Sequence, residues 1–360
     1  MKIKDIGTVV TGKTPATSHA EFYDGDYMFV TPTELHNGYK VSASEKTITD
    51  AGLKSIKSNI IDGISVLVGC IGWDMGNVAM CFEKCATNQQ INSVTRIKDS
   101  FNPYFLYYWL STQKDYLFSI ASVTRTPILS KGVFEEIELP NIDRLKQDRI
   151  SKMLLVLDRK IEYNAAVNDN LQQMAHITFM HSFWGKPANG TIGDILIERE
   201  KSPIQVGQAK NAIGNYPFFT SGDAILRWTS PLTAGRNIFM NTGGNAGVKF
   251  YVGEAAYSTD TWCVSARDGL ADYLYLLLSS IKPELSQKFF QGTGLKHLQK
   301  PALKNRPMYI PSKDELEVFN RSVIPWLTLV SDNIRESERL TTLRDWLLPM
   351  LMNGQATISD

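Results

Sequence analysis

The chain has 360 residues, of which 43% are hydrophobic, and a formal net charge of +1, values typical of a globular protein of two or three domains. No run approaches 18 apolar residues and the first residues lack an apolar leader, so the sequence predicts neither a membrane span nor a secretory signal. Its four cysteines, Cys70, Cys81, Cys85 and Cys263, fit a reducing cytoplasm better than a disulfide framework.

Five short segments of the first half recur in the same order in the second half, so the sequence contains an internal repeat. The pairs are Ile6-Gly7 and Ile192-Gly193, Pro15 and Pro203, Tyr27–Thr31 and Tyr216–Thr220, Phe105–Ser111 and Tyr273–Ser279, and Leu139-Pro140 and Ile310-Pro311. The offset falls from about 189 to about 168 residues along the chain, which places extra loop residues of the first copy within 36–62. A period this long is too long for a solenoid and indicates a duplicated module.

Each copy mixes short strands with a late aromatic helix, which predicts an α/β (α+β) fold. Runs at 65–68, 238–240 and 248–252 read as strands. Gly- and Asn-rich turns at 72–77 and 242–247 occupy matching places, as do the loops 124–127 and 292–297. Loops held by a rigid scaffold are where recognition residues usually lie.

A long heptad-patterned helix follows each copy, near 143–183 and 312–353. In the first helix the seam is Ile150, Leu154, Leu157, Ile161, Asn164, Asn168, Leu171 and Ala175, and in the second it is Phe319, Val323, Trp326, Val330, Asn333, Leu340, Leu343 and Leu347. Two such helices in one chain pair only if they run antiparallel, which predicts a coiled coil with an approximate two-fold axis. The alternative is ordinary core packing within a larger domain, although helices of this length are rarely found there.

Three features modify this helical pattern. Asn164 and Asn168 lie on the seam, either near a wet edge of the helix or as a device that fixes the register of the pair. Ser312 and Glu315 form a capping box for the second helix. Pro325 lacks an amide donor and should kink that helix or divide it in two.

These features divide the chain into four segments. Globular domains are expected at 1–142 and 187–311, and helices that set a spacing and dock partners at 143–186 and 312–360. The globular segments carry net charges of −2 (13 Lys and Arg against 15 Asp and Glu) and +4 (13 against 9). Neither is basic enough to hold nucleic acid by bulk electrostatics alone.

Three motifs resemble catalytic or metal-binding signatures without the context that these need. Residues 7–14 match the phosphate-binding pattern G-x-x-x-x-G-K-[ST], but Pro15 disfavours the helix that should start at Lys13-Thr14. Asn102-Pro103-Tyr104-Phe105 lacks the second proline of the amino-methyltransferase motif, and reads better as a helix N-cap. Cys81 and Cys85 have no second ligand pair for zinc. No catalytic centre is expected.

The duplicated domain-plus-helix layout resembles the specificity subunit of type I restriction–modification enzymes. The most specific pieces are Ile6–Pro15, Leu157–Asn164 and Leu343–Gly354. The resemblance implies two target recognition domains that each read half of a split DNA site, and paired helices that set the spacer and dock two methyltransferase subunits. It also implies that S-adenosylmethionine, and ATP with magnesium, belong to partner methyltransferase and motor/nuclease subunits, with no cofactor or metal in this chain.

Candidate residues for this role are of two kinds. For contact with double-stranded DNA we expect Lys13, Thr14, Thr31, Trp73, Gln89, Gln90, Arg125, Thr126, Thr220, Asn245 and Lys296, because loop donors and acceptors match groove edges and phosphates. For helix pairing we expect Leu154, Leu157, Ile161, Asn164, Leu171, Val323, Val330, Asn333, Leu340 and Leu343. Two other functions stay open: a protein-assembly scaffold with two ligand-binding lobes, and a P-loop enzyme.

Overall fold

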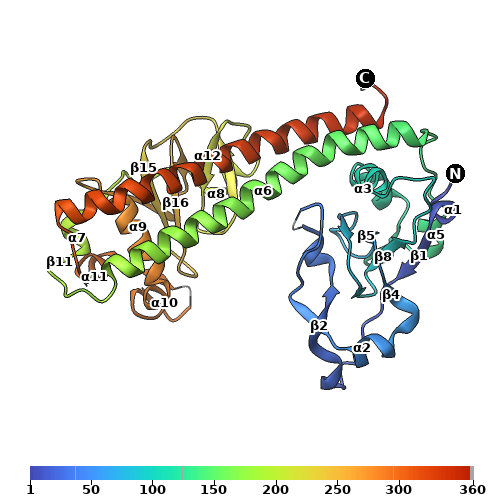
Figure 1. The fold of residues 1–360 in the computed structure, drawn as a ribbon, viewed down its shortest axis with the longest axis horizontal. Helices are drawn as coiled ribbons and strands as arrows, with labels where there is room; N and C mark the ends of the chain where they lie inside the picture. Colours follow the sequence, from blue (N-terminus) through green and yellow to red (C-terminus); the bar gives the residue numbers. More distant parts are fainter. Residues whose placement is uncertain (37, 124, 295, 357–360) are drawn as a thin grey trace. The chain divides into compact units, whose positions relative to one another are not determined.

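The computed structural model describes residues 1–36, 38–123, 125–294 and 296–356 (Figure 1). The chain forms two compact units: unit 1 contains residues 1–161 and 339–360, and unit 2 contains residues 162–338. Both long helices contribute residues to both units. Among the described residues no helix has the length and apolar character needed to span a membrane.

Unit 1 is built on a four-stranded antiparallel sheet in the order β1-β8-β5-β6. A second sheet has the order β3-β2-β7-β4, with β2 and β7 parallel. The strands are β1 (Thr8–Thr11), β2 (Tyr23–Val30), β3 (Lys46–Ile48), β4 (Ile60–Ile61), β5 (Ser65–Gly69), β6 (Val78–Cys81), β7 (Cys85–Thr87), β8 (Ile91–Thr95), β9 (Ser122–Val123) and β10 (Pro127–Ile128). The helices are α1 (Ile3–Ile6), α2 (Asp50–Ser55), α3 (Pro103–Ser111), α4 (Lys114–Ser119) and α5 (Lys131–Glu135).

Unit 2 has a main antiparallel sheet in the corresponding order, β12-β18-β15-β16, and a smaller sheet β14-β13-β17. Its strands are β11 (Gly190–Thr191), β12 (Leu196–Glu198), β13 (Tyr216–Phe219), β14 (Ile225–Trp228), β15 (Arg236–Asn241), β16 (Val248–Val252), β17 (Ala256–Tyr257), β18 (Thr261–Ala266), β19 (Phe290–Gln291), β20 (His297–Leu298) and β21 (Pro307–Met308). Its helices are α7 (Ile192–Ile195), α8 (Val206–Ala209), α9 (Ala271–Ser280), α10 (Lys282–Glu284) and α11 (Lys300–Lys304).

The predicted repeat is therefore visible in the strand pairing. Val66 pairs with Val94 in unit 1, and Ile238 pairs with Val264 at the matching place in unit 2. The aromatic helix is α3 in one copy and α9 in the other, and each is buried in the core of its unit. The longer connection lies in unit 1, where residues 31–64 carry β3, α2 and β4.

One of the sequence matches was misaligned. The structural counterpart of Ile192 is Ile3 rather than Ile6, because α1 and α7 both begin two residues before an aspartate that closes a capping box, Asp5 and Asp194. With this correction the two short helices have the same offset as the strands β2 and β13. Ile3 and Ile6 are both buried on the same face of α1, so the sequence alone does not show which of them corresponds to Ile192.

The two long helices have the same length and the same place in the repeat. Helix α6 (Arg144–Phe183) and helix α12 (Lys313–Met352) each contain 40 residues, and both ends are offset by the same 169 residues that separate Asn164 from Asn333. Within unit 1, Asp158 of α6 contacts Arg344 of α12. Within unit 2, Asn168 contacts Asn333, whereas Lys186, just after α6, reaches Glu315 at the start of α12. The helices thus pair antiparallel in each unit, as predicted.

Most predicted seam residues face the partner helix or the core, with local exceptions. Leu154, Asn164, Val323, Val330 and Asn333 are buried. The half-buried members are Leu157, Ile161, Leu171 and Leu340. Leu343 is 42% exposed, and Arg344 takes the inward place beside Asp158. Consecutive side chains of a helix point about 100° apart. Because Asp158 and Arg344 occupy the inward positions here, the neighbouring residue Leu343 is turned outwards.

The seam asparagines form a polar cluster inside unit 2. The amide nitrogen of Asn333 donates to the side-chain oxygen of Asn168 at 2.8 Å, and that of Asn164 donates to Ser337 at 3.2 Å. Asn164 and Asn333 are related by the helix offset, as are Asn168 and Ser337, so each contact is the repeat counterpart of the other. The buried asparagines are paired with polar groups of the opposite helix, which excludes the wet-edge alternative.

The start of α12 agrees with the sequence, but Pro325 does not divide the helix. The backbone nitrogen of Ser312 donates to Glu315 at 2.8 Å, and that of Glu315 donates to the Ser312 hydroxyl at 3.4 Å, which completes the predicted capping box. Helix α12 continues unbroken through Pro325. Its ring lies on the exposed side, where water can satisfy the carbonyl that the missing amide leaves unpaired.

A candidate nucleic-acid interface

Four loops meet at one end of the main sheet of unit 1. The strands β1 and β5 end here, and β6 and β8 begin here, so the antiparallel order alone gathers the loops 12–14, 70–77 and 88–90. The amide of Gly12 donates to Ile91 at 3.0 Å, and that of Cys70 donates to Gln90 at 2.7 Å. The amide of Gly72 donates to Pro127 at 3.0 Å, which adds the β9–β10 hairpin. We refer to these four loops as the unit 1 tip.

Gly12 is required for this close approach. A Cβ atom at this position would lie 2.1 Å from the backbone oxygen of Asn88 and 2.2 Å from the Thr87 hydroxyl. No side chain fits at such distances, so the glycine holds the first loop against the third. This packing explains the glycine of the phosphate-loop-like motif. Residues 12–16 form no helix, which removes the structural basis of a P-loop at Lys13 and Thr14.

The unit 1 tip brings together most of the candidate DNA-contacting residues of this unit. The exposed side chains are Lys13, Trp73, Gln89, Arg125 and Thr126, whereas Thr14 and Gln90 are half-buried. The Thr14 hydroxyl donates to the Gln89 side chain at 2.9 Å. The Gln90 side-chain oxygen accepts from Asn88 at 2.9 Å.

Trp73 projects from the tip on a braced loop. Its side chain is 71% exposed, and its ring centroid lies 6.1 Å from that of Phe118 on α4. Lys114 of the same helix donates to Asp74 at 2.8 Å and to Asn77 at 3.0 Å. The lysine lowers the pKa of the Asp74 carboxyl, which keeps the ion pair charged. Sequence analysis missed Lys114, because nothing in the chain order brings α4 to this loop.

Thr31 lies outside the unit 1 tip and bonds within its own turn. Its backbone amide and its hydroxyl both donate to the same oxygen of Glu34, at 2.8 and 2.7 Å. Burial raises the pKa of the Glu34 carboxyl, but hydrogen bonds from Thr31 and from the Glu45 amide outweigh it and lower the pKa overall. The threonine therefore caps the turn after β2, and its hydroxyl is engaged within that turn.

Unit 2 presents the same set of loops at the same end of its sheet. The amide of Gly244 donates to Lys296 at 2.9 Å, and that of Leu298 donates to Thr242 at 2.9 Å. These are the counterparts of the Gly72–Pro127 and Leu129–Cys70 contacts of unit 1. Asn245 thereby occupies the place of Trp73. We refer to this set as the unit 2 tip.

Two of the three candidates in unit 2 are exposed there. Asn245 and Lys296 have exposed side chains on adjoining loops of the unit 2 tip. Thr220 is 5% exposed, and its hydroxyl donates to the backbone oxygen of Ala224 at 3.0 Å. The Lys249 ammonium donates to the backbone oxygen of Thr220 at 2.7 Å, so both the hydroxyl and the carbonyl of Thr220 bond within unit 2.

Two further motifs have structural roles. Asn102 is the N-cap of α3, and its side-chain oxygen accepts from the amides of Tyr104 and Phe105 at 2.8 and 3.1 Å, with Pro103 in the first turn. Cys81 and Cys85 lie in the core with their sulfur atoms 3.3 Å apart. Among the described residues, no cluster of three His, Cys, Asp or Glu side chains has metal-binding geometry.

Comparison with known proteins gives a consistent family. The model of the type I restriction modification DNA specificity domain matches residues 1–173 and 187–319. The chain is 24% identical to the type I restriction enzyme MjaIX specificity subunit of Methanocaldococcus jannaschii, covering 100% of the chain and 93% of that protein. It is 32% identical to the HindI specificity subunit of Haemophilus influenzae over 38% of the chain and 30% of that protein. The crystal structure of a type I restriction-modification S subunit from M. genitalium matches with a TM-score of 0.62 and 16% identity, over 98% of this chain and 95% of that one.

Proposed function

Because the chain belongs to the type I restriction–modification DNA specificity family, we propose that its two tips each read one half of a bipartite double-stranded DNA target. The chain selects the site and carries out no chemistry. Methyltransferase subunits bring S-adenosylmethionine, and a motor/nuclease subunit brings ATP and magnesium. The complex acts in the cytoplasm.

The observation that carries this proposal is the duplicated tip. In both units the same two backbone hydrogen bonds join matching loops, but the loops carry different side chains: Trp73 in one and Asn245 in the other. Two domains that recognise different half-sites need the same loop backbone with different exposed side chains. Base edges are read by such donors, acceptors and apolar groups, whereas cations such as Lys13 and Lys296 hold phosphates.

We further propose that the helices act as a ruler between the half-sites. Each helix of 40 residues measures about 60 Å at about 1.5 Å per residue. The paired Asn164 and Asn333 clusters specify one register, because a slip would leave buried amides without partners. A fixed register gives one spacer length.

Exposed apolar residues on the helices support docking of two methyltransferase subunits. Met174 and Ile177 of α6 in unit 2 are 46% and 65% exposed. Their repeat counterparts, Leu343 and Trp346 of α12 in unit 1, are 42% and 61% exposed. An exposed apolar pair that recurs at the offset between the two helices favours one partner that binds twice, since such patches mark interaction sites.

The test of recognition is mutation of one tip at a time. The complex of this chain with its methyltransferase subunit is given a random DNA pool, and the methylated adenines are sequenced. We expect Arg125→Ala to relax one half-site and Asn245→Ala the other, each by about 1–3 kcal/mol of base discrimination. Loss of discrimination at both half-sites from either change, or methylation without bipartite preference, contradicts the proposal. The second outcome favours a protein-assembly scaffold.

The ruler is tested by length. Insertion of whole helical turns between Ile161 and Leu171, with a matching insertion in α12, is expected to lengthen the spacer and leave both half-sites unchanged. The same methylation assay measures both quantities. Altered half-sites with the original spacer would refute the ruler.

A further inference from the structure

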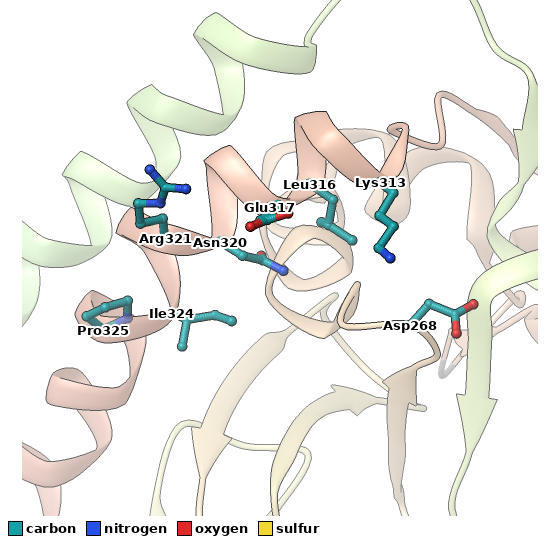
Figure 2. A pocket seen from close by; sticks show the side chains of 8 residues that line it. All are labelled: Asp268, Lys313, Leu316, Glu317, Asn320, Arg321, Ile324 and Pro325. Carbon is teal, nitrogen blue, oxygen red and sulfur yellow. The ribbon is translucent and has the colours of Figure 1, made fainter.

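Each unit has a groove at the start of its long helix, and the two grooves are copies of each other. The groove of unit 2 has a volume of about 580 Å³ and is lined by Asp268, Lys313, Leu316, Glu317, Asn320, Arg321, Ile324 and Pro325 (Figure 2). The groove of unit 1, about 250 Å³, is lined by Asn102, Tyr104, Asp148, Ser151, Lys152, Leu155, Val156 and Arg159. Five lining positions of α6 recur in α12 at the offset between the two helices.

The five shared positions keep their chemistry. In chain order, the five positions of each helix carry an acid, a polar side chain, a cation, an aliphatic side chain and a further apolar side chain. In unit 1 these are Asp148, Ser151, Lys152, Leu155 and Val156, and in unit 2 they are Glu317, Asn320, Arg321, Ile324 and Pro325. None of these residues belongs to the predicted helix seam, so packing between the helices does not require them to match.

Each groove contains an unsatisfied buried polar atom. The Ser151 hydroxyl is buried without a hydrogen-bond partner, and its residue is 3% exposed. In unit 2 the side-chain oxygen of Asn320 has no partner either, although its amide nitrogen donates to Gly269 at 3.0 Å. Leaving such an atom unpaired is costly, so its recurrence in both copies points to a ligand that pairs with it.

Each groove also contains an unpaired cation. In the part of the chain that the structure describes, Lys152 and Arg321 have neither an ion pair nor a hydrogen bond with another side chain. Figure 2 shows Arg321, Ile324 and Pro325 at one end of the groove, and Lys313 and Asp268 at the other. A carboxylate is the natural complement of the cation, and an aliphatic side chain is the complement of Leu155 or Ile324.

We propose that the two grooves bind the same segment of two copies of the methyltransferase subunit, a segment that carries a carboxylate next to an aliphatic side chain. The carboxylate pairs with Lys152 in one groove and Arg321 in the other. The inference rests on the proposed function and adds a second contact surface, with its chemistry, to the exposed apolar pairs of α6 and α12. A DNA backbone fits the grooves less well, because it presents a row of phosphates that cannot all avoid Asp148 or Glu317, whereas a single carboxylate can lie at the cation and away from that acid.

Charge reversal in the intact chain tests the proposal. The chain is co-expressed with its methyltransferase subunit, and native mass spectrometry counts the bound copies. We expect Lys152→Glu and Arg321→Glu each to remove one of two copies, with about tenfold or greater loss of affinity at the altered groove. The double variant is expected to bind neither. Lys57→Glu and Lys282→Glu, at exposed positions outside the grooves, are the charge-matched controls.

The outcomes distinguish a failure of the groove proposal from a failure of the proposed function. Two copies retained by both single variants, or equal losses in the control variants, would overturn the grooves as docking sites. A loss of DNA affinity with unchanged subunit count would also overturn them, and would assign the grooves to DNA. The proposed function stands in these cases if the complex still methylates a bipartite site. Circular dichroism confirms that each variant is folded.

Discussion

A buried ion pair joins three helices of unit 1, and its removal gives a sharp prediction. Asp158 of α6 is 3% exposed and accepts hydrogen bonds from the Tyr108 hydroxyl and from the Arg344 guanidinium, both at 2.6 Å. Burial raises the pKa of Tyr108, so its hydroxyl stays protonated and remains a donor. The change Arg344→Met leaves the carboxylate buried with the tyrosine as its one remaining strong partner among the described side chains.

The expected loss follows from the burial of the two groups. Removing one member of a fully buried pair costs about 3–5 kcal/mol, because the other charge stays in a poorly solvated place. Arg344 is 23% exposed and also contacts Asp345, so we expect about 2–4 kcal/mol. The double variant Asp158→Leu/Arg344→Met should recover most of this loss, since well-packed apolar replacements of a buried pair are often neutral.

Hydrogen exchange of the α3 and α6 amides in unit 1 measures this loss locally. A global melting curve is unsuitable, because a protein of two units need not unfold in one step. A loss of about 2–4 kcal/mol corresponds to roughly 30- to 700-fold faster exchange, at about 1.4 kcal/mol per factor of ten. Arg339→Met, on an exposed face of α12, is the control. Exchange within about twofold of the wild type, or a double variant as unstable as both single changes combined, would refute the reasoning.

Three other predictions concern the helices and the unit 1 tip. Asn333→Leu should destabilise the helix pair of unit 2 by about 1–3 kcal/mol, because it leaves the buried side-chain oxygen of Asn168 without its donor. Asn168→Leu in the same chain should restore part of this loss; additive losses by hydrogen exchange would contradict this. The pKa of the Glu315 carboxyl is lowered from 4.5 to about 2, chiefly by its hydrogen bond with Lys186. The stabilisation that this carboxylate gives to the start of α12 is therefore complete above pH 4.5 and is lost as the pH falls towards 2. The same pH dependence in Glu315→Gln would show that another group is responsible. Gly12→Ala should displace the loop at Asn88 and weaken recognition of one half-site at least tenfold, because a Cβ has no room there; an unchanged methylated sequence would show that the tip tolerates the shift.

The local pattern determined much of the fold. Hydrophobic periodicity predicted both long helices to within about two residues, because a heptad stripe over 40 residues far exceeds chance. The capping box at Ser312 and the N-cap at Asn102 were also legible, since each depends on residues no more than three positions apart. The order of repeated segments established the duplication and, through the resemblance that it supports, the family.

Only tertiary structure decided which residues meet. The polar anchor of Asp158, Tyr108 and Arg344 is invisible in a seam defined by apolar spacing, because its members lie 50 and 186 residues apart. The sequence suggested that the hydroxyls of Thr31 and Thr220 were free, but in the structure each one donates a hydrogen bond within its own turn. The grooves beside Ser151 and Asn320 likewise depend on how each helix packs against the turn before α3 or α9. Local sequence sets the elements because their hydrogen bonds are local, whereas sites form from long-range packing that no short window contains.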